Sequence, residues 1–307
     1  MSQRCAIVFP GQGSQRPGML EHLPDVPDLD RLLDAAEGLS GLPLRDIARG
    51  DDESALSDTR AAQPLLFLAD WAWGVTLISE GIEPVALAGH SLGELAAVTV
   101  AGCISVEAGL ELVVLRSRLM AEAAAASPGA MAAVLGMDRD DVVAVLSGVG
   151  GVWVANDNAP GQVVISGTKR AVEEDALREL TAAGARRVVP LKVSGAFHSP
   201  LMTNAAERFA EVLCQVQFRD AAYPIVQNAA PEPARDGRTI RSRLEEQIVR
   251  PVRWTETMLR LLEMGADTLI EAGPGSVLSG LARRVEGLTG LSVDAEGLDR
   301  IREEVSR

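Results

Sequence analysis

The sequence predicts an α/β fold in which a large lobe, built on a parallel sheet, carries a small inserted ferredoxin-like lobe. Short apolar strands alternate with longer helical segments over most of the 307 residues, a pattern typical of a parallel sheet covered by helices. The chain is 47% hydrophobic but only 3% aromatic, which suits layers packed from aliphatic side chains. Between residues 128 and 193 the expected order becomes strand-helix-strand-strand-helix-strand, the ferredoxin-like order. We therefore assign 1–127 and 194–307 to the large lobe and 128–193 to the small one.

The first half of the large lobe begins with a predicted buried strand over 5–10. Helices are expected over 28–39 and 64–80, with Pro64 at a first helical position, where its missing N–H costs nothing. A strand over 85–88 and a helix over 95–101 follow. Ser105 is then a suitable N-cap for a long helix that reaches about residue 125.

The rest of the chain completes the two lobes. In the small lobe we expect strands over 130–135, 152–156, 162–166 and 187–193 and helices over 138–146 and 168–183. In the large lobe we expect helices over 201–216, 240–249, 254–264, 277–284 and 298–305, strands over 223–227 and 268–272, and one further strand after residue 285. The insertion predicts a cleft between the lobes, and His198 lies where the chain leaves the small lobe.

Composition excludes several classes of function. The net charge of −14 argues against broad nucleic-acid binding. On the sequence alone no apolar run reaches membrane-spanning length, and the N-terminal residues enter a strand directly, so we expect no membrane partner and no signal peptide. Cys5, Cys103 and Cys214 lie in apolar segments at unrelated spacings, which predicts reduced core thiols and no disulfide or metal site. We expect a cytoplasmic monomer.

Residues 89–93 read Gly-His-Ser-Leu-Gly and match the Gly-x-Ser-x-Gly pattern of the nucleophile elbow found in α/β hydrolases. Small residues at both flanks permit a tight strand-to-helix turn, and the start of the helix directs free N–H groups toward an oxyanion. The alternative is an ordinary turn with a helix-capping serine. The strand before Ser91 and the helix after it favour the elbow.

A nucleophilic serine needs a base within hydrogen-bond reach, and the chain has only three histidines. The side chain of His90 should diverge from that of its neighbour Ser91. His22 lies in a polar loop near the N-terminus. His198 is therefore the best candidate for the base, the alternative being a loop histidine with no role.

Two further features remain open on the residues alone. Arg116 falls on the apolar side of its helix, whereas Arg118 falls on a more polar side. A cation on an apolar face needs either an internal carboxylate or an anionic ligand, and the pattern favours neither. The glycine-rich loop 11–15 lacks the Lys-Ser/Thr of a phosphate-binding loop. It is either a loop that brings Gln12 near the reaction centre or a plain turn.

Several segments, in this order and spacing, together carry a family resemblance. They are 9–15 (Phe-Pro-Gly-Gln-Gly-Ser-Gln), 89–94 (Gly-His-Ser-Leu-Gly-Glu), Arg116, 129–131 (Gly-Ala-Met), 158–162 (Asn-Ala-Pro-Gly-Gln), 195–198 (Gly-Ala-Phe-His), Gln247, 251–252 (Pro-Val), Trp254 and 271–275 (Glu-Ala-Gly-Pro-Gly). From residue 5 to about 285, the chain resembles the malonyl-CoA:acyl carrier protein transacylases and the related acyltransferase domains of polyketide synthases.

The resemblance implies a role for each matched catalytic position. Ser91 would be the nucleophile that carries the acyl ester, and His198 the base that later serves as the acid. Gln247 would hold the imidazole through its backbone carbonyl, so that no carboxylate is needed. Arg116 would bind the malonyl carboxylate as a bidentate pair, which decides the alternatives above in favour of a ligand.

The resemblance also implies the oxyanion hole and the acyl selectivity. The backbone N–H groups of Gln12 and Leu92 would form the hole. Phe197, immediately before the histidine, resembles the malonyl-selective type, because it fills the space of an α-methyl group. Arg250 stands where many members have Asn, a departure for which we expect no effect on the chemistry.

The function implied is ping-pong transfer of a malonyl group from malonyl-CoA to the phosphopantetheine thiol of an acyl carrier protein, for fatty-acid or polyketide biosynthesis. No metal and no resident cofactor is implied. The carrier is expected to be acidic, and Arg186, Arg187 and Lys192 are candidates for a local basic docking patch. The alternatives are an acyl hydrolase on the same scaffold, an unrelated esterase with an acidic triad member, and a non-catalytic docking module.

Overall fold

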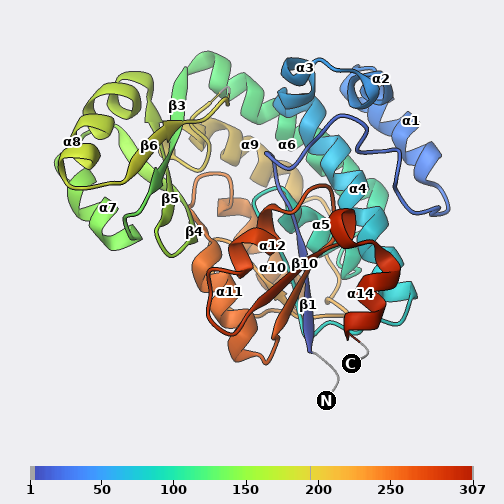
Figure 1. The fold of residues 1–307 in the computed structure, drawn as a ribbon. Coiled ribbons are helices and arrows are strands. Elements are labelled where there is room, and N and C mark those ends of the chain that lie inside the picture. The colour runs from blue at the N-terminus through green and yellow to red at the C-terminus, as the bar shows by residue number, and fades with distance from the viewer. Residues whose placement is uncertain (1–3, 194, 306–307) are drawn as a thin grey trace.

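A computed structural model of the chain describes residues 4–193 and 195–305 and contains two five-stranded sheets (Figure 1). In the first, all strands are parallel and the order is β10-β9-β1-β2-β7. Its strands are β1 Cys5–Phe9, β2 Leu87–Gly89, β7 Ile225–Val226, β9 Thr268–Glu271 and β10 Thr289–Ser292. The second has the order β6-β3-β5-β4-β8, with β3 Gly129–Leu135, β4 Val152–Ala159, β5 Gln162–Thr168, β6 Arg187–Pro190 and β8 Val252–Arg253.

Helices follow most of the strands, as expected for this class. The α-helices are α1 Leu29–Ser40, α2 Leu44–Arg49, α3 Glu53–Ser57, α4 Thr59–Ser79, α5 Gly93–Val100, α6 Val106–Ala126, α7 Arg139–Leu146, α8 Leu177–Ala182, α9 Thr203–Leu213, α10 Gly237–Glu246, α11 Trp254–Glu263, α12 Val277–Ala282, α13 Val293–Glu296 and α14 Leu298–Val305. A π-helical turn, η1 Ala171–Ala176, precedes α8, and a 3₁₀ turn, η2 Pro200–Met202, precedes α9.

Both faces of the parallel sheet are buried. Along β1, Ile7 and Phe9 pack into one apolar cluster with α4 and α6, while Ala6 and Val8 pack into a second cluster with α11 and α12. Alternate residues of a strand point to opposite faces, so helices on both sides require a strand that is apolar throughout. The predicted α/β fold with a parallel sheet at its core is confirmed.

The second sheet contains the predicted ferredoxin-like unit. Its first four strands have the order β6-β3-β5-β4 and are antiparallel, with α7 and α8 packed against them. The sheet is not confined to residues 128–193, because β8 from the large lobe pairs with β4 in parallel. The division of the chain into 1–127 with 194–307 and 128–193 stays a prediction, and this strand pair joins the two parts.

The predicted start of the helix at Pro64 is wrong. Helix α4 begins at Thr59, and the carboxylate of Asp58 accepts a hydrogen bond from the backbone N–H of Arg60 at 2.9 Å. An N-cap of this kind satisfies one of the free N–H groups at a helix start. Pro64 therefore lies inside the helix, where it removes one backbone hydrogen bond, and the burial of the surrounding turn compensates.

The same helix also overturns the expectation that no apolar run reaches membrane-spanning length. By length and composition α4 could cross a membrane, since it has 21 residues and a mean hydropathy of 1.2 in its most apolar window. However, 72% of that window is buried inside the fold, where α4 packs against α5 and α6. It is the central helix of the core.

The expectation of three core thiols is wrong at one position. Cys5 and Cys103 are buried, but Cys214 is exposed. It caps the C-terminus of α9, and its Sγ donates to the carbonyl oxygen of Glu211 at 3.0 Å. The buried face of α9 is formed by other positions, among them Phe209 and Leu213, and Cys214 lies outside that face.

Glycine at position 93 is required by contact with β1, so we predict that Gly93→Ala destabilises the fold. A Cβ there would lie 2.1 Å from the carbonyl oxygen of Phe9, a backbone atom that cannot move aside. We expect a loss of about 3 kcal/mol in the free energy of unfolding, measured by urea denaturation.

The matched control is Gly280→Ala in α12, where no atom lies within 4 Å of the added Cβ. It should be neutral or stabilising by about 0.5 kcal/mol, since alanine loses less conformational entropy on folding. Equal stability of the two variants would contradict the claim that contact with β1 requires glycine at position 93.

Candidate active site

Ser91 stands at the apex of the turn between β2 and α5, as the elbow pattern predicts. Its φ of 52° lies in the left-handed region that residues with a side chain rarely adopt. A Cβ on Gly89 would lie 2.0 Å from the carbonyl carbon of Gly93, so strand and helix approach too closely for any other residue. The turn presents Ser91 to a small cavity.

The backbone of the turn is fixed by Asn228, a residue that sequence reasoning missed. The N–H of Ser91 donates to Asn228 Oδ1 at 2.7 Å, and Asn228 Nδ2 donates to the carbonyl oxygen of Gly89 at 2.5 Å. The buried carboxylate of Glu94 accepts from the N–H of Asn228 at 2.8 Å and from Gln227 Nε2 at 3.0 Å. Polar residues directly after strand β7 were the available signal, because ligand sites gather at the carboxyl ends of parallel strands.

The imidazole of His198 lies against the serine. Its Nε2 is 2.7 Å from Ser91 Oγ, and its Nδ1 is 3.1 Å from the carbonyl oxygen of Gln247 and 3.0 Å from that of Arg250. Since both Nδ1 partners are acceptors, Nδ1 carries the hydrogen and Nε2 is free to accept the serine proton. The side chain of Arg250 turns away to Glu246, so this residue meets the imidazole through its backbone carbonyl.

The other two histidines are excluded as partners of Ser91, as expected. His90 Nε2 lies 2.9 Å from Asn158 Oδ1, and its ring packs edge-on against Trp254. His22 is exposed in the N-terminal loop.

The electrostatic environment keeps His198 neutral. Burial, together with the nearby charges of Arg116 and His90, lowers the pKa of His198 to about 3. A neutral imidazole is the form that can accept a proton, so this residue can act as a base over a wide pH range.

Arg116 is completely buried and forms no ion pair within residues 4–193 and 195–305. Its guanidinium donates to amide oxygens, from Nη1 to Gln63 Oε1 at 2.8 Å and from Nη2 to Gln247 Oε1 at 3.0 Å. Nη2 also donates to Ser91 Oγ at 3.1 Å. Burial lowers the pKa of Arg116 to about 10, which still leaves the cation intact at neutral pH. The internal carboxylate that would neutralise the cation directly is therefore missing from the described part of the chain.

The amides proposed for the oxyanion hole face the same cavity as Ser91. The backbone N–H groups of Gln12 and Leu92 have no hydrogen-bond partner among the residues that the structure describes. The side chain of Gln12 is turned away, since its Nε2 donates to the carbonyl oxygen of Ser57 and to Thr59 Oγ1, both at 3.3 Å. Two free N–H groups beside a serine–histidine pair can stabilise the negative oxygen of a tetrahedral intermediate.

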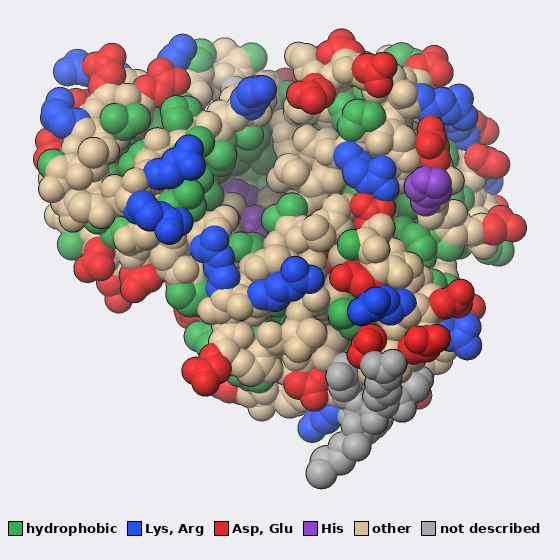
Figure 2. All heavy atoms as spheres, in the orientation of Figure 1, with side chains coloured by type: hydrophobic (Ala, Val, Ile, Leu, Met, Phe, Trp, Pro, Cys, Tyr) green, Lys and Arg blue, Asp and Glu red, His purple; other side chains and the backbone are tan. Residues whose placement is uncertain are grey.

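The cavity itself has a volume of about 100 Å³, which suits a small acyl group. Phe197 is buried in its wall, together with Met120, Met131 and Val164. Histidine side chains are visible at the bottom of the hollow between the two lobes (Figure 2). Within the described residues, no three His, Cys, Asp or Glu side chains are grouped as a metal site.

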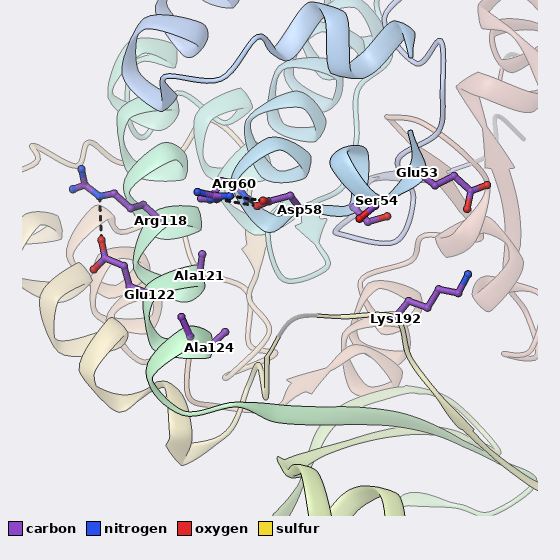
Figure 3. Close-up of a pocket in the computed structure, with 11 residues that line it drawn as sticks. Glu53, Ser54, Asp58, Arg60, Arg118, Ala121, Glu122, Ala124 and Lys192 are labelled. Carbon is purple, nitrogen blue, oxygen red and sulfur yellow. Dashed lines mark hydrogen bonds and ion pairs between the residues drawn. The ribbon is translucent and has the colours of Figure 1, made fainter. Parts of the chain in front are cut away.

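A larger hollow of about 1070 Å³ lies beside the small cavity. Its wall includes the Arg60–Asp58 and Arg118–Glu122 ion pairs, and Lys192 extends from the opposite side (Figure 3). It contains no serine–histidine pair, so the chemistry belongs to the smaller cavity. The residues on either side of Lys192 line that smaller cavity, and the two spaces therefore adjoin.

Comparison with known proteins places this geometry in a family. The model of the acyl transferase domain matches residues 6–289. The malonyl CoA-acyl carrier protein transacylase of Synechocystis sp. is 41% identical over 281 residues, which cover 92% of this chain and 93% of the relative. The enzyme of the same name from Bacillus subtilis is 41% identical over 288 residues, covering 92% and 90%.

Solved structures agree with the sequence comparison. The Synechocystis malonyl-CoA:ACP transacylase superposes with a TM-score of 0.88 at 39% identity, covering 98% of this chain and 99% of that one. A malonyl transacylase in complex with a type II polyketide synthase acyl carrier protein gives 0.89 at 37% identity, with the same coverage. The transacylase from Coxiella burnetii gives 0.92 at 32% identity, covering 100% and 99%.

We predict that Ser91 stays reactive well below pH 6.5, the ordinary pKa of histidine. A base must be neutral to accept a proton, and a lowered pKa extends the neutral form to lower pH. The rate at which a fluorophosphonate probe labels Ser91, measured from pH 8 downward, should therefore fall only as the pH approaches the lowered value.

The control is Arg116→Met, which removes one of the causes that lower the pKa of His198. Its labelling rate should begin to fall at a higher pH than in the wild type. A wild-type rate that is half lost near pH 6.5 would refute the neutral-imidazole account.

Proposed function

The chain belongs to the acyl transferase domain family, and on that premise we propose that it moves a malonyl group from malonyl-CoA to the phosphopantetheine thiol of an acyl carrier protein. The observation that carries the proposal is Arg116, a buried cation with no ion-pair partner in the described residues, 3.1 Å from Ser91 Oγ. A malonyl group is an acyl group that ends in a carboxylate. It therefore supplies the anion that the cavity lacks.

The first half-reaction loads the serine. His198 Nε2 takes the proton of Ser91 Oγ while Oγ attacks the thioester carbonyl of malonyl-CoA. The carbonyl oxygen becomes negative and accepts hydrogen bonds from the backbone N–H groups of Gln12 and Leu92. The carbon–sulfur bond then breaks, and the proton on His198 passes to the departing thiolate of CoA.

The second half-reaction transfers the malonyl group from Ser91 to the carrier. The thiol of the carrier gives its proton to His198 and attacks the ester carbonyl, and the same two N–H groups stabilise the oxyanion. Ser91 Oγ departs and recovers the proton, so each atom of the enzyme returns to its starting state. The carbonyl oxygens of Gln247 and Arg250 hold the imidazole throughout. This chemistry requires no resident cofactor, because malonyl-CoA brings the activated thioester and the carrier brings the accepting thiol.

An acidic carrier protein requires a basic docking surface, and a chain of net negative charge can offer one only as a local patch. Arg186, Arg187 and Lys192 are exposed and have no ion-pair partner among the described residues. Lys and Arg side chains gather around the hollow on the face shown in Figure 2. We infer that an acidic carrier docks on this side and inserts its pantetheine arm through the larger hollow. Such a transfer supplies fatty-acid or polyketide assembly. The free cysteines of the chain favour a cytoplasmic location.

Hydrolysis is less well supported than transfer. A hydrolase for neutral acyl chains has no use for the buried cation of Arg116. An esterase with an acidic triad member is disfavoured too, since His198 Nδ1 lies against backbone carbonyls. A docking module would not need the contact between Ser91 and His198.

Intact-protein mass spectrometry tests the proposal. Malonyl-CoA should give a malonyl-sized adduct on the wild type, and Ser91→Ala should give none, because no other residue carries the ester. Acetyl-CoA should load more slowly, since an acetyl group leaves Arg116 unpaired. The absence of an adduct, or equal loading by both donors, would refute the assignment.

The size of the cavity leads to a second prediction for the acyl group. Phe197→Ser should increase loading by methylmalonyl-CoA relative to malonyl-CoA by about tenfold or more, because it frees the space of one methyl group. The ratio of the two initial loading rates is the measurement. An unchanged ratio would show that Phe197 does not set selectivity.

A further inference from the structure

The guanidinium of Arg116 is held by two glutamine side chains. We propose that Gln63 and Gln247 position Arg116 for acyl groups that end in a carboxylate, and that selectivity depends on both being amides and not acids. The inference rests on the proposed function. It assigns a positioning role to Gln63, which no sequence pattern predicted, and a second role to Gln247 through its side chain.

A count of donors supports the arrangement. An arginine has five N–H groups in a planar fork. Gln63 takes one from Nη1, Gln247 takes one from Nη2, and Ser91 Oγ takes one from Nη2. One N–H on Nη1 and the N–H on Nε remain, and the latter is buried without a partner in the part of the chain that the structure describes. An incoming carboxylate can therefore take the free Nη1 hydrogen together with the Nη2 hydrogen that Ser91 Oγ releases.

Each amide is itself oriented by a second contact. Gln63 is 1% exposed, and its Nε2 lies 3.5 Å from the sulfur of Met120, so its oxygen points to Arg116. Gln247 Nε2 donates to the carbonyl oxygen of Ser91 at 2.6 Å, which directs Oε1 to Arg116. The cation is thus fixed relative to the nucleophile through the side chain of Gln247.

The neutrality of the two amides is the second part of the argument. A carboxylate at either position would form a charge-assisted hydrogen bond and cancel the positive charge locally. An amide oxygen accepts the same hydrogen bond and leaves the charge available. Within the described residues, Glu94 is the one acid whose charge acts on Arg116, and it forms no ion pair with it. A malonyl carboxylate then meets a cation that is oriented but not neutralised.

Gln63→Glu tests this directly, because it changes an amide to an acid of the same shape. Initial loading rates with malonyl-CoA and acetyl-CoA are measured by intact-protein mass spectrometry. The new acid would compete with the malonyl carboxylate for Arg116. We expect the malonyl:acetyl ratio to fall roughly tenfold to a hundredfold, the range for losing the hydrogen bond between Arg116 and that carboxylate. A merely structural role would lower both rates together and leave the ratio unchanged, which would overturn the proposal.

Two control variants separate charge from fold. Gln63→Met removes the acceptor without adding charge, so its ratio should fall less; an equal fall in both variants would overturn the neutrality argument. Gln215→Glu makes the same change in the exposed turn after α9 and should leave the ratio unchanged. If Gln63→Glu is not folded by circular dichroism, Gln63→Met still tests the positioning role, and a malonyl:acetyl ratio equal to that of the wild type would overturn it. A wild type without a serine-linked adduct would instead refute the proposed function.

Discussion

The buried, unneutralised charge of Arg116 is the constraint on which the active site depends. Removing a guanidinium from water is costly unless the charge is paired. The lowered pKa of Arg116 reflects that cost. The fold satisfies part of the hydrogen-bonding capacity with neutral oxygens from Gln63, Gln247 and Ser91. Within the described residues it provides no ion-pair partner for Arg116, although the charge of Glu94 acts on it. The site is therefore stable enough to form and is still complementary to an anion.

The scaffold fixes this site with contacts that cross between distant parts of the chain. Strand β8 pairs with β4, and Thr255 Oγ1 donates to the carboxylate of Asp157 at 2.8 Å. Close to the nucleophile, His90 joins Asn158 across the same boundary. Position and orientation of reacting groups contribute a large part of catalysis, so such contacts matter although they touch no substrate.

A buried carboxyl group in the core departs from ordinary packing. Both side-chain oxygens of Asp70 are buried without a hydrogen-bond partner among the described residues, and a Cβ on Gly273 would lie 2.1 Å from Oδ1. Burial and the charge of Glu271 raise the pKa of Asp70 well above its usual range, so folding favours its protonated form. Pro10, which leads into the Gln12 loop, contacts the same glycine position. Buried polar groups that break the packing rules are typical of regions next to functional sites.

The sequence predicted those features that have a local signature. The elbow is a five-residue pattern, the ferredoxin-like order follows from hydrophobic periodicity, and the place of Arg116 follows from helical spacing. Asn228 and Gln63 were missed because their side chains bind residues far away in the chain. The local signal for Asn228 was its place directly after strand β7, whereas Gln63, a single amide within α4, had none. Propensity also failed at Pro64, where the Asp58 cap and burial decided the helix start.

The proximity of Arg116 and His198 connects binding with proton transfer. The cation lowers the pKa of the imidazole, because a second positive charge nearby is unfavourable. An anion paired with Arg116 offsets that effect, so the pKa of His198 rises and the imidazole becomes a stronger base. An acyl group with a carboxylate therefore improves the base that must deprotonate the attacking thiol, whereas a neutral acyl group leaves it weak. On this electrostatic ground, discrimination between acyl groups extends from binding to the chemical step itself.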